Sequence, residues 1–149
     1  MITLTLPRPK FWLWGGPLAL LLAGAAAHGI MMLLPPPADL DLSTTQPSKL
    51  GTFVATVETG DLTLGDAMTW TFAMTDADGN AIDTGDLRVD GGMPLHGHGL
   101  PFAPAAPRPV GDGRYEVDGI QFSMPGWWVI TLHRATPLGD DTATFNFTM

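Results

Sequence analysis

The segment Met68-Thr69-Trp70-Thr71-Phe72-Ala73-Met74 decides the fold, because large apolar side chains alternate in it with smaller or polar ones. A period of two is typical of a β-strand that buries one face and leaves the other half-exposed. The turn residues Asp78-Gly79-Asn80 follow, so we expect this strand to end before them and another to begin after them. No helical periodicity occurs beyond the N-terminal apolar run, so the sequence predicts a mainly β domain.

Further strands are predicted on both sides of this segment. Residues 52–57 upstream are rich in β-branched side chains, as strands usually are. Downstream, apolar residues and turn residues predict short strands at residues 87–89, 114–117, 120–124, 127–132 and 142–147. About seven such strands indicate an immunoglobulin-like antiparallel β-sandwich over residues 51–149, a length that supports one core.

An apolar run without Asp, Glu, Lys or Arg occupies residues 11–34. As a helix of about 24 residues it would extend about 36 Å, enough to cross a hydrocarbon core of about 30 Å. Arg8 and Lys10 precede the run, and the positive-inside rule places that end in the cytoplasm. We therefore expect a cytoplasmic N-terminus, one transmembrane helix, a linker and an exported domain, at residues 1–10, 11–34, 35–50 and 51–149.

A cleavable signal peptide is the competing interpretation of the same run. Ala25-Ala26-Ala27 offers the small residues that a signal peptidase prefers after an apolar stretch. The apolar run continues past this point through Ile30 to Leu34, however. This continuation favours a retained membrane anchor.

The net charge of −8 is spread unevenly along the chain. From Asp39 onward there are 15 acids and 5 bases, a balance of −10, because Arg8 and Lys10 account for the other two of the 7 basic residues. Such a composition argues against nucleic-acid binding, which needs a basic surface, and suits contact with cations or a basic partner. The chain has no Cys, so Met and His are its soft or borderline metal ligands.

The segment GGMPLHGHGLPFAP, from Gly91 to Pro104, carries the candidate functional residues. Its glycines and prolines predict a rigid irregular loop, and this loop presents Met93, His96 and His98. Two imidazoles alone make a weak metal site, so we expect further ligands from Met93 and from outside the loop. The outside candidates are Met124, before Pro125-Gly126, and His133, at the end of a predicted strand.

Copper fits this donor set better than zinc does. Thioethers favour Cu(I), imidazoles accept either oxidation state, and methionine is a poor zinc ligand. Imidazoles coordinate only when neutral, so binding should weaken below about pH 6. The alternative is a surface loop with incidental histidines, in which Met93 and Met124 belong to the core and His133, opposite in phase to Trp128, Ile130 and Leu132, is a rim residue.

Two motifs resemble a family of membrane-anchored bacterial proteins with a YtkA-like or FixH-like domain. The first is Met93-Pro94-x-His96-Gly97-His98-Gly99-x-Pro101, and the second is Phe122-x-Met124-Pro125-Gly126-x-Trp128, with Gly113-x-Tyr115 between them. The resemblance implies a small periplasmic β-sandwich linked to copper handling or to assembly of respiratory oxidases. Ser123 stands where some relatives carry His, and His133 lies outside both motifs, so the second motif would contribute Met124 alone.

Two functions follow from these observations. The first is a single-pass protein of the bacterial inner membrane whose periplasmic domain holds copper or delivers it to a partner such as a respiratory oxidase. The second is a non-catalytic structural or assembly subunit that uses the Gly/Pro/His loop as an interaction surface. An enzyme is not expected, because the sequence has neither a nucleophile motif nor a glycine-rich phosphate loop.

Overall fold

The computed structural model describes residues 16–24 and 35–149, and the chain divides into two compact units after Pro35. Residues 16–24 form a helix. Among the described residues, no helix has both the length and the apolar character needed to cross a membrane. Residues 1–10, most of the predicted anchor and the Ala25-Ala26-Ala27 segment lie outside the described residues.

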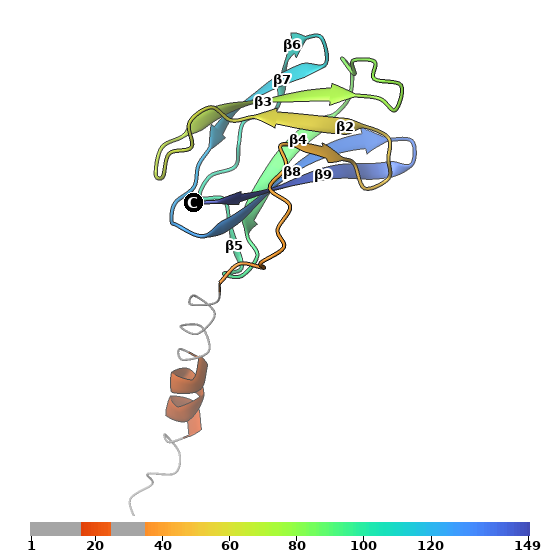
Figure 1. Cartoon of the computed structure of the whole chain (residues 1–149). Helices are drawn as coiled ribbons and strands as arrows, with labels where there is room; N and C mark the ends of the chain where they lie inside the picture. The colour runs from red at the N-terminus through yellow and green to blue at the C-terminus, as the bar shows by residue number, and fades with distance from the viewer. Residues whose placement is uncertain (1–15, 25–34) are drawn as a thin grey trace, which may run out of the picture. The chain divides into compact units, whose positions relative to one another are not determined.

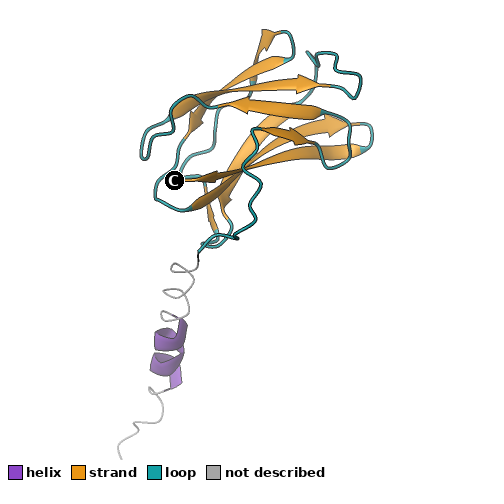
Figure 2. Cartoon of the chain, in the orientation of Figure 1, coloured by secondary structure: helices purple, strands orange, loops and turns teal. Residues whose placement is uncertain are grey.

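Residues 35–149 fold into two antiparallel sheets, which confirms the mainly β prediction (Figures 1 and 2). The first sheet contains, in spatial order, β1 (Thr45–Pro47), β2 (Val54–Glu58), β3 (Met68–Thr75), β7 (Arg114–Ile120) and β6 (Arg108–Gly111). The second contains β5 (His98–Gly99), β4 (Leu87–Met93), β8 (Trp127–Thr136) and β9 (Gly139–Thr148).

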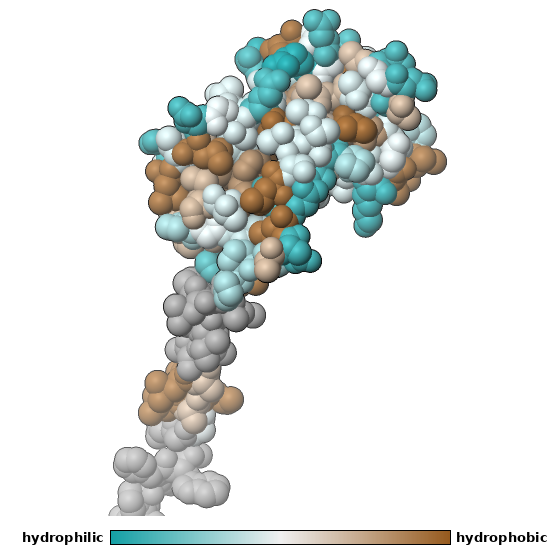
Figure 3. All heavy atoms as spheres, in the orientation of Figure 1, coloured by the Kyte–Doolittle hydropathy of each residue, from teal (hydrophilic) through white to brown (hydrophobic). Residues whose placement is uncertain are grey.

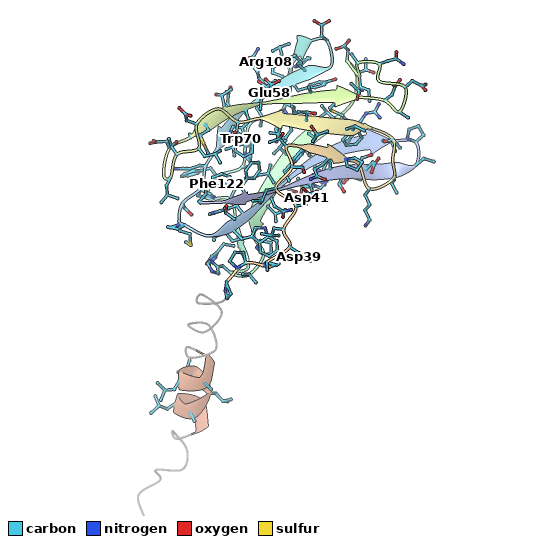
Figure 4. All side chains as sticks on the ribbon, viewed as in Figure 1. Asp39, Asp41, Glu58, Trp70, Arg108 and Phe122 are labelled. Atoms are coloured by element: carbon cyan, nitrogen blue, oxygen red, sulfur yellow. The ribbon has the colours of Figure 1, made fainter. Side chains whose placement is uncertain are left out.

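The two sheets share one hydrophobic core. Strand β3 buries alternate residues, and its Trp70 and Phe72 are fully buried, as the period-two pattern predicts. Contacts between aromatic rings join the sheets: the ring centroids of Trp70 and Phe147 are 4.7 Å apart, and those of Phe72 and Phe145 are 5.9 Å apart. Figure 4 shows Trp70 and Phe122 inside the domain, and Figure 3 shows polar and apolar residues interspersed on its visible face. Each buried aromatic side chain stabilises the fold by roughly 2–3 kcal/mol.

The structure has nine strands in residues 35–149, against the seven predicted from sequence. The additional strands are β1, β5 and β6, which are short and almost entirely exposed, so they have no alternating pattern for a sequence to reveal. The predicted strand at residues 120–124 is wrong beyond Ile120. There the chain forms a loop, in which Phe122 makes an isolated bridge to Leu64 in the loop between β2 and β3.

The segment predicted as a linker, residues 35–50, is partly structured. Besides containing β1, it is ordered around Asp41, whose carboxylate accepts hydrogen bonds of 2.9 Å each from Ser43 N–H and Gln46 Nε2. These bonds from Ser43 and Gln46 lower the pKa of Asp41 to about 2. The Asp41 carbonyl also accepts a 2.9 Å hydrogen bond from Asn146 Nδ2 on β9. The folded domain therefore begins near residue 41 and not at residue 51.

The domain has two ends that matter for function. The hairpin end carries the turn 94–97 between β4 and β5, the loop 121–126 and the C-terminal Met149, whose backbone pairs with Gly126. The turn end carries the turns at residues 111–113 and 136–139. Strand β8 runs from the hairpin end to the turn end, a distance of about 30 Å for ten residues.

Candidate metal centre

The Met/His segment forms a short β-hairpin at the edge of the second sheet. Met93 in β4 pairs with His98 in β5, and the intervening turn closes when the N–H groups of His96 and Gly97 donate to the Met93 carbonyl at 3.1 and 2.9 Å. Gly97 has φ +65°, a conformation that favours glycine. A Cβ at Gly92 would overlap the His98 carbonyl, so glycine there lets β5 lie against β4. The glycines thus fix where both histidines lie.

The structure brings His96 and His98 together. Their ring centroids are 6.1 Å apart and their planes are inclined by 74°. A bound ion such as zinc lies about 2.0–2.1 Å from an imidazole nitrogen, so two rings sharing one ion have centroids at most about 6.4 Å apart. His98 is exposed, whereas Nδ1 of the half-buried His96 is buried and has no hydrogen-bond partner. The pair therefore has a separation that suits a shared ion and an imidazole nitrogen with no protein partner.

Met93 and Met124 lie at the same end of the domain but in different surroundings. Met93 is 2% exposed and belongs to the core, and its Cε is 2.7 Å from where a Cβ on Gly126 would be. Met124 is half-buried against the core, and its carbonyl accepts a 3.0 Å hydrogen bond from Trp128 Nε1. The two sequence motifs are therefore neighbours in space, and Met124 is the thioether that retains some exposure.

The structure does not bring His133 to the hairpin. It pairs with Arg88 on β4, five residues from Met93, which places it about 17 Å away along the strand. Its Nδ1 is 2.9 Å from Asp140 Oδ2 and 2.7 Å from Arg88, and its Nε2 is 3.2 Å from Asp90 Oδ2 without hydrogen-bond alignment. The bond from His133 and the charge on Arg88 lower the pKa of Asp140. His133 is thus part of a charged surface cluster.

The donor set at the hairpin is therefore small. Among residues 16–24 and 35–149, no group of three or more His, Cys, Asp and Glu side chains is placed to hold a metal ion. Two imidazoles remain, with Met124 at the same end of the domain as the predicted soft third donor.

Sequence reasoning missed a hollow of about 300 Å³ beside the hairpin, lined by Asp90, Gly91, Gly92, Met93, Pro94, Gly97, His98, Val129 and Thr131. Two consecutive residues of β4, Gly91 and Gly92, form part of its wall. At Gly91 a Cβ would lie 2.5 Å from the Val129 carbonyl, so the position also requires close contact between β4 and β8. A Gly-Gly pair inside a strand was the available sequence signal.

Comparison with known proteins is consistent with the sequence resemblance. A search of curated proteins and a search of solved structures both find no match. The model of the YtkA-like family matches residues 45–133, a span that starts at β1 and includes all five candidate ligands. The FixH-like part of the resemblance stays a prediction. Since the match covers 89 of the 149 residues, more than half, the chain belongs to the YtkA-like family.

Proposed function

We propose that this protein binds a copper ion through His96 and His98 and holds it for, or delivers it to, a partner metalloprotein. The observation that carries the proposal is the pair of imidazoles 6.1 Å apart on a hairpin, one of them with a buried nitrogen that has no partner. An unsatisfied buried polar atom costs about 1–3 kcal/mol, a cost that coordination of His96 would remove. The protein would act by binding and release, without catalysis.

The chemistry around the hairpin supports copper. Residues 91–107 contain no Asp, Glu, Lys or Arg, and Asp90 is the one carboxylate in the lining of the hollow beside His98, so the site has few of the oxygen ligands that a hard cation prefers. Imidazole accepts either copper oxidation state, and the thioether of Met124 would favour Cu(I). Met93 would serve the site indirectly, since its burial fixes the β4 residue opposite His98.

The proposal includes a location and a partner. The apolar run at residues 11–34 would anchor the chain in a bacterial inner membrane, with the β domain in the periplasm. Copper would then pass to a periplasmic metalloprotein, of which a respiratory oxidase is one example.

The strand order supports the finer fold assignment as well. Without the short edge strands β1 and β5, the sheets have the orders β2-β3-β7-β6 and β4-β8-β9. These correspond to the A-B-E-D and C-F-G sheets of an immunoglobulin-like domain. The hairpin would then lie at the edge of the C strand, where the second sheet is open to a partner.

Copper titration of residues 36–149 tests the proposal. The double variant His96→Ala and His98→Ala should lose about a hundredfold or more in affinity, because both nitrogen donors disappear. The control is His133→Ala, which removes an imidazole from the charged cluster and should leave copper affinity unchanged. Equal, weak binding by the wild type and the double variant would exclude the copper site.

A structural or assembly role is the second candidate, and the small donor set favours it. Two imidazoles and one half-buried thioether make a modest site, and an uncharged hairpin also suits protein contact. An assembly subunit would be expected to expose its tryptophans, but Trp128 is fully buried and Trp127 donates a 3.0 Å hydrogen bond to Asn146 Oδ1. The copper titration separates the two roles.

A further inference from the structure

The position at which the chain enters the folded domain helps to identify the end of the domain that contacts a partner. Asp41 is held by Asn146 on β9. Asn146 pairs with Val129 on β8, Val129 with Gly92 on β4, and Gly92 with Gly99 on β5. These residues form one row across the sheet, and the row ends beside His98. The chain therefore enters the domain at the level of the candidate copper site.

The length of chain before this point is short. Residues 34 to 41 span seven residues, which reach about 25 Å at full extension. Three of these residues, Pro35-Pro36-Pro37, restrict the backbone to stiff extended conformations. Figure 4 shows Asp39 beyond Asp41, toward the edge of the domain where Figure 1 places β5. The turn end lies about 24 Å further along β9, since Gly139 is seven residues from Asn146.

We propose that the hairpin end of the domain faces the bilayer, so that copper is exchanged with the outward face of a membrane-embedded protein. This inference rests on the proposed function, because it assumes that residues 11–34 are an anchor and that His96 and His98 bind copper. A short tether attached at the hairpin end holds that end toward the membrane and keeps the turn end away from it. A copper acceptor that diffuses freely in the periplasm would gain nothing from this orientation.

The charges at the hairpin end favour a protein over lipid headgroups. The segments 59–68, 91–103 and 119–127 supply this end, and none of them contains Lys or Arg. The basic residues of the described chain lie in the middle of the sheets or toward the turn end: Lys49, Arg88, Arg108, Arg114 and Arg134. Two acids, Asp61 and Asp66, lie in the loop that pairs with Phe122. Anionic headgroups attract basic segments, so they would not bind here.

The apolar character of the hairpin end fits a protein surface. Leu62 and Leu64 are 37% and 48% exposed, and Pro94 and Pro125 are also exposed. Together with the half-buried Met124, these residues give the hairpin end apolar surface beside the two acids. The occupant that fits is an uncharged, outward-facing surface of a membrane-embedded copper protein.

The experiment uses single-cysteine variants of the full chain, which has no native cysteine. Ser123→Cys labels the exposed loop at the hairpin end, and Leu138→Cys labels the turn end, where Leu138 is 74% exposed. Each variant carries a fluorescent donor and is reconstituted into phosphatidylcholine vesicles with acceptor dyes on the lipid headgroups. We expect severalfold stronger energy transfer from position 123 than from position 138. Equal transfer, stronger transfer from position 138, or a chain that does not incorporate would overturn the proposed orientation.

A photo-crosslinking probe at position 123 in native membranes identifies the occupant. The expected product joins the chain to a membrane-spanning protein whose copper content falls when His96→Ala and His98→Ala are introduced. Crosslinks to lipid alone, or to a soluble protein, would overturn the proposed partner. Copper content is measured separately on the purified full chain. Transfer from position 123 without bound copper contradicts the copper function alone, whereas bound copper with reversed orientation contradicts this inference alone.

Discussion

The two ends of the domain place their histidines in different surroundings. At the turn end, His133 is surrounded by Arg88, Asp90 and Asp140, and the buried carboxylate of Asp141 accepts bonds from Leu50 N–H at 2.7 Å and Thr52 Oγ1 at 2.6 Å. At the hairpin end, His96 has a buried nitrogen without a partner beside the exposed His98. Nε2 of His133 is also buried without a hydrogen bond, but the Asp90 carboxylate lies 3.2 Å from it. Polar groups with such partners stabilise a fold, while groups without them are available to bind.

Met93 is an exception to the contrast between the two ends, because it lies at the hairpin end but belongs to the core. Met93→Ala should lower the free energy of unfolding by about 3 kcal/mol, the usual cost of a cavity left by a buried methionine. Urea unfolding of residues 36–149 measures the effect. Met124→Ala, at a half-buried position, serves as the control with a smaller loss. A loss below about 1 kcal/mol at Met93 would mean that its packing matters little.

Asp141 is a buried carboxylate at the turn end, and its pKa predicts how the stability of the domain depends on pH. Burial raises its pKa, but hydrogen bonds from Ser48, Thr52 and the Leu50 N–H outweigh burial and hold the pKa at about 2. A depressed carboxylate pKa stabilises the fold above the unfolded value of about 3.9, and this stability disappears as the pH falls through the folded value.

Asp141→Asn should therefore reduce stability by about 2 kcal/mol at neutral pH and by much less near the folded pKa. Unfolding measured across this acid range tests the expectation, with the exposed Asp78→Asn as control. A constant loss at every pH would show that packing of the side chain, and not its charge, is responsible. Copper affinity should be unaffected, since Asp141 lies at the turn end.

The pH dependence of copper binding probes the hairpin end. Coordination needs neutral imidazoles, so affinity should fall by about tenfold or more between about pH 7 and pH 5.5. Titration of the wild-type domain at several pH values measures this. The fold should remain intact over the same range, as circular dichroism would verify. An affinity independent of pH would exclude His96 and His98 as the ligands.

His133→Ala should have the smallest effect. Exposed ion pairs contribute up to about 1 kcal/mol and are weakened by salt, so the variant should lose little stability and even less at high ionic strength. The side chains of Arg88 and Asp140 around it are 57% and 49% exposed, which places this cluster in that class. Unfolding at low and high salt measures the difference. A large fall in copper affinity would contradict the separation of His133 from the hairpin.

Individual residues show how much of the fold and of the candidate site could be predicted from the sequence. The alternation at Trp70 and Phe72 predicted β3, and the phase of His133 against Trp128 and Ile130 predicted its outward position, which the structure confirms. Strand β5 was not predicted, because two exposed residues, His98 and Gly99, leave no periodic signal. The partly structured linker was missed for a related reason: Asp41 is fixed by Asn146, a residue 105 positions away.

The sequence by itself determined the mainly β class, most of the strands and the identity of the candidate ligands, because side-chain periodicity and donor chemistry are local properties. Tertiary structure alone decided that His96 and His98 form a pair, that Met93 belongs to the core and that His133 joins a charged cluster. These outcomes depend on register between strands distant in sequence. Register sets which residues become neighbours across a sheet, and between strands distant in sequence it is fixed only when their apolar faces pack together.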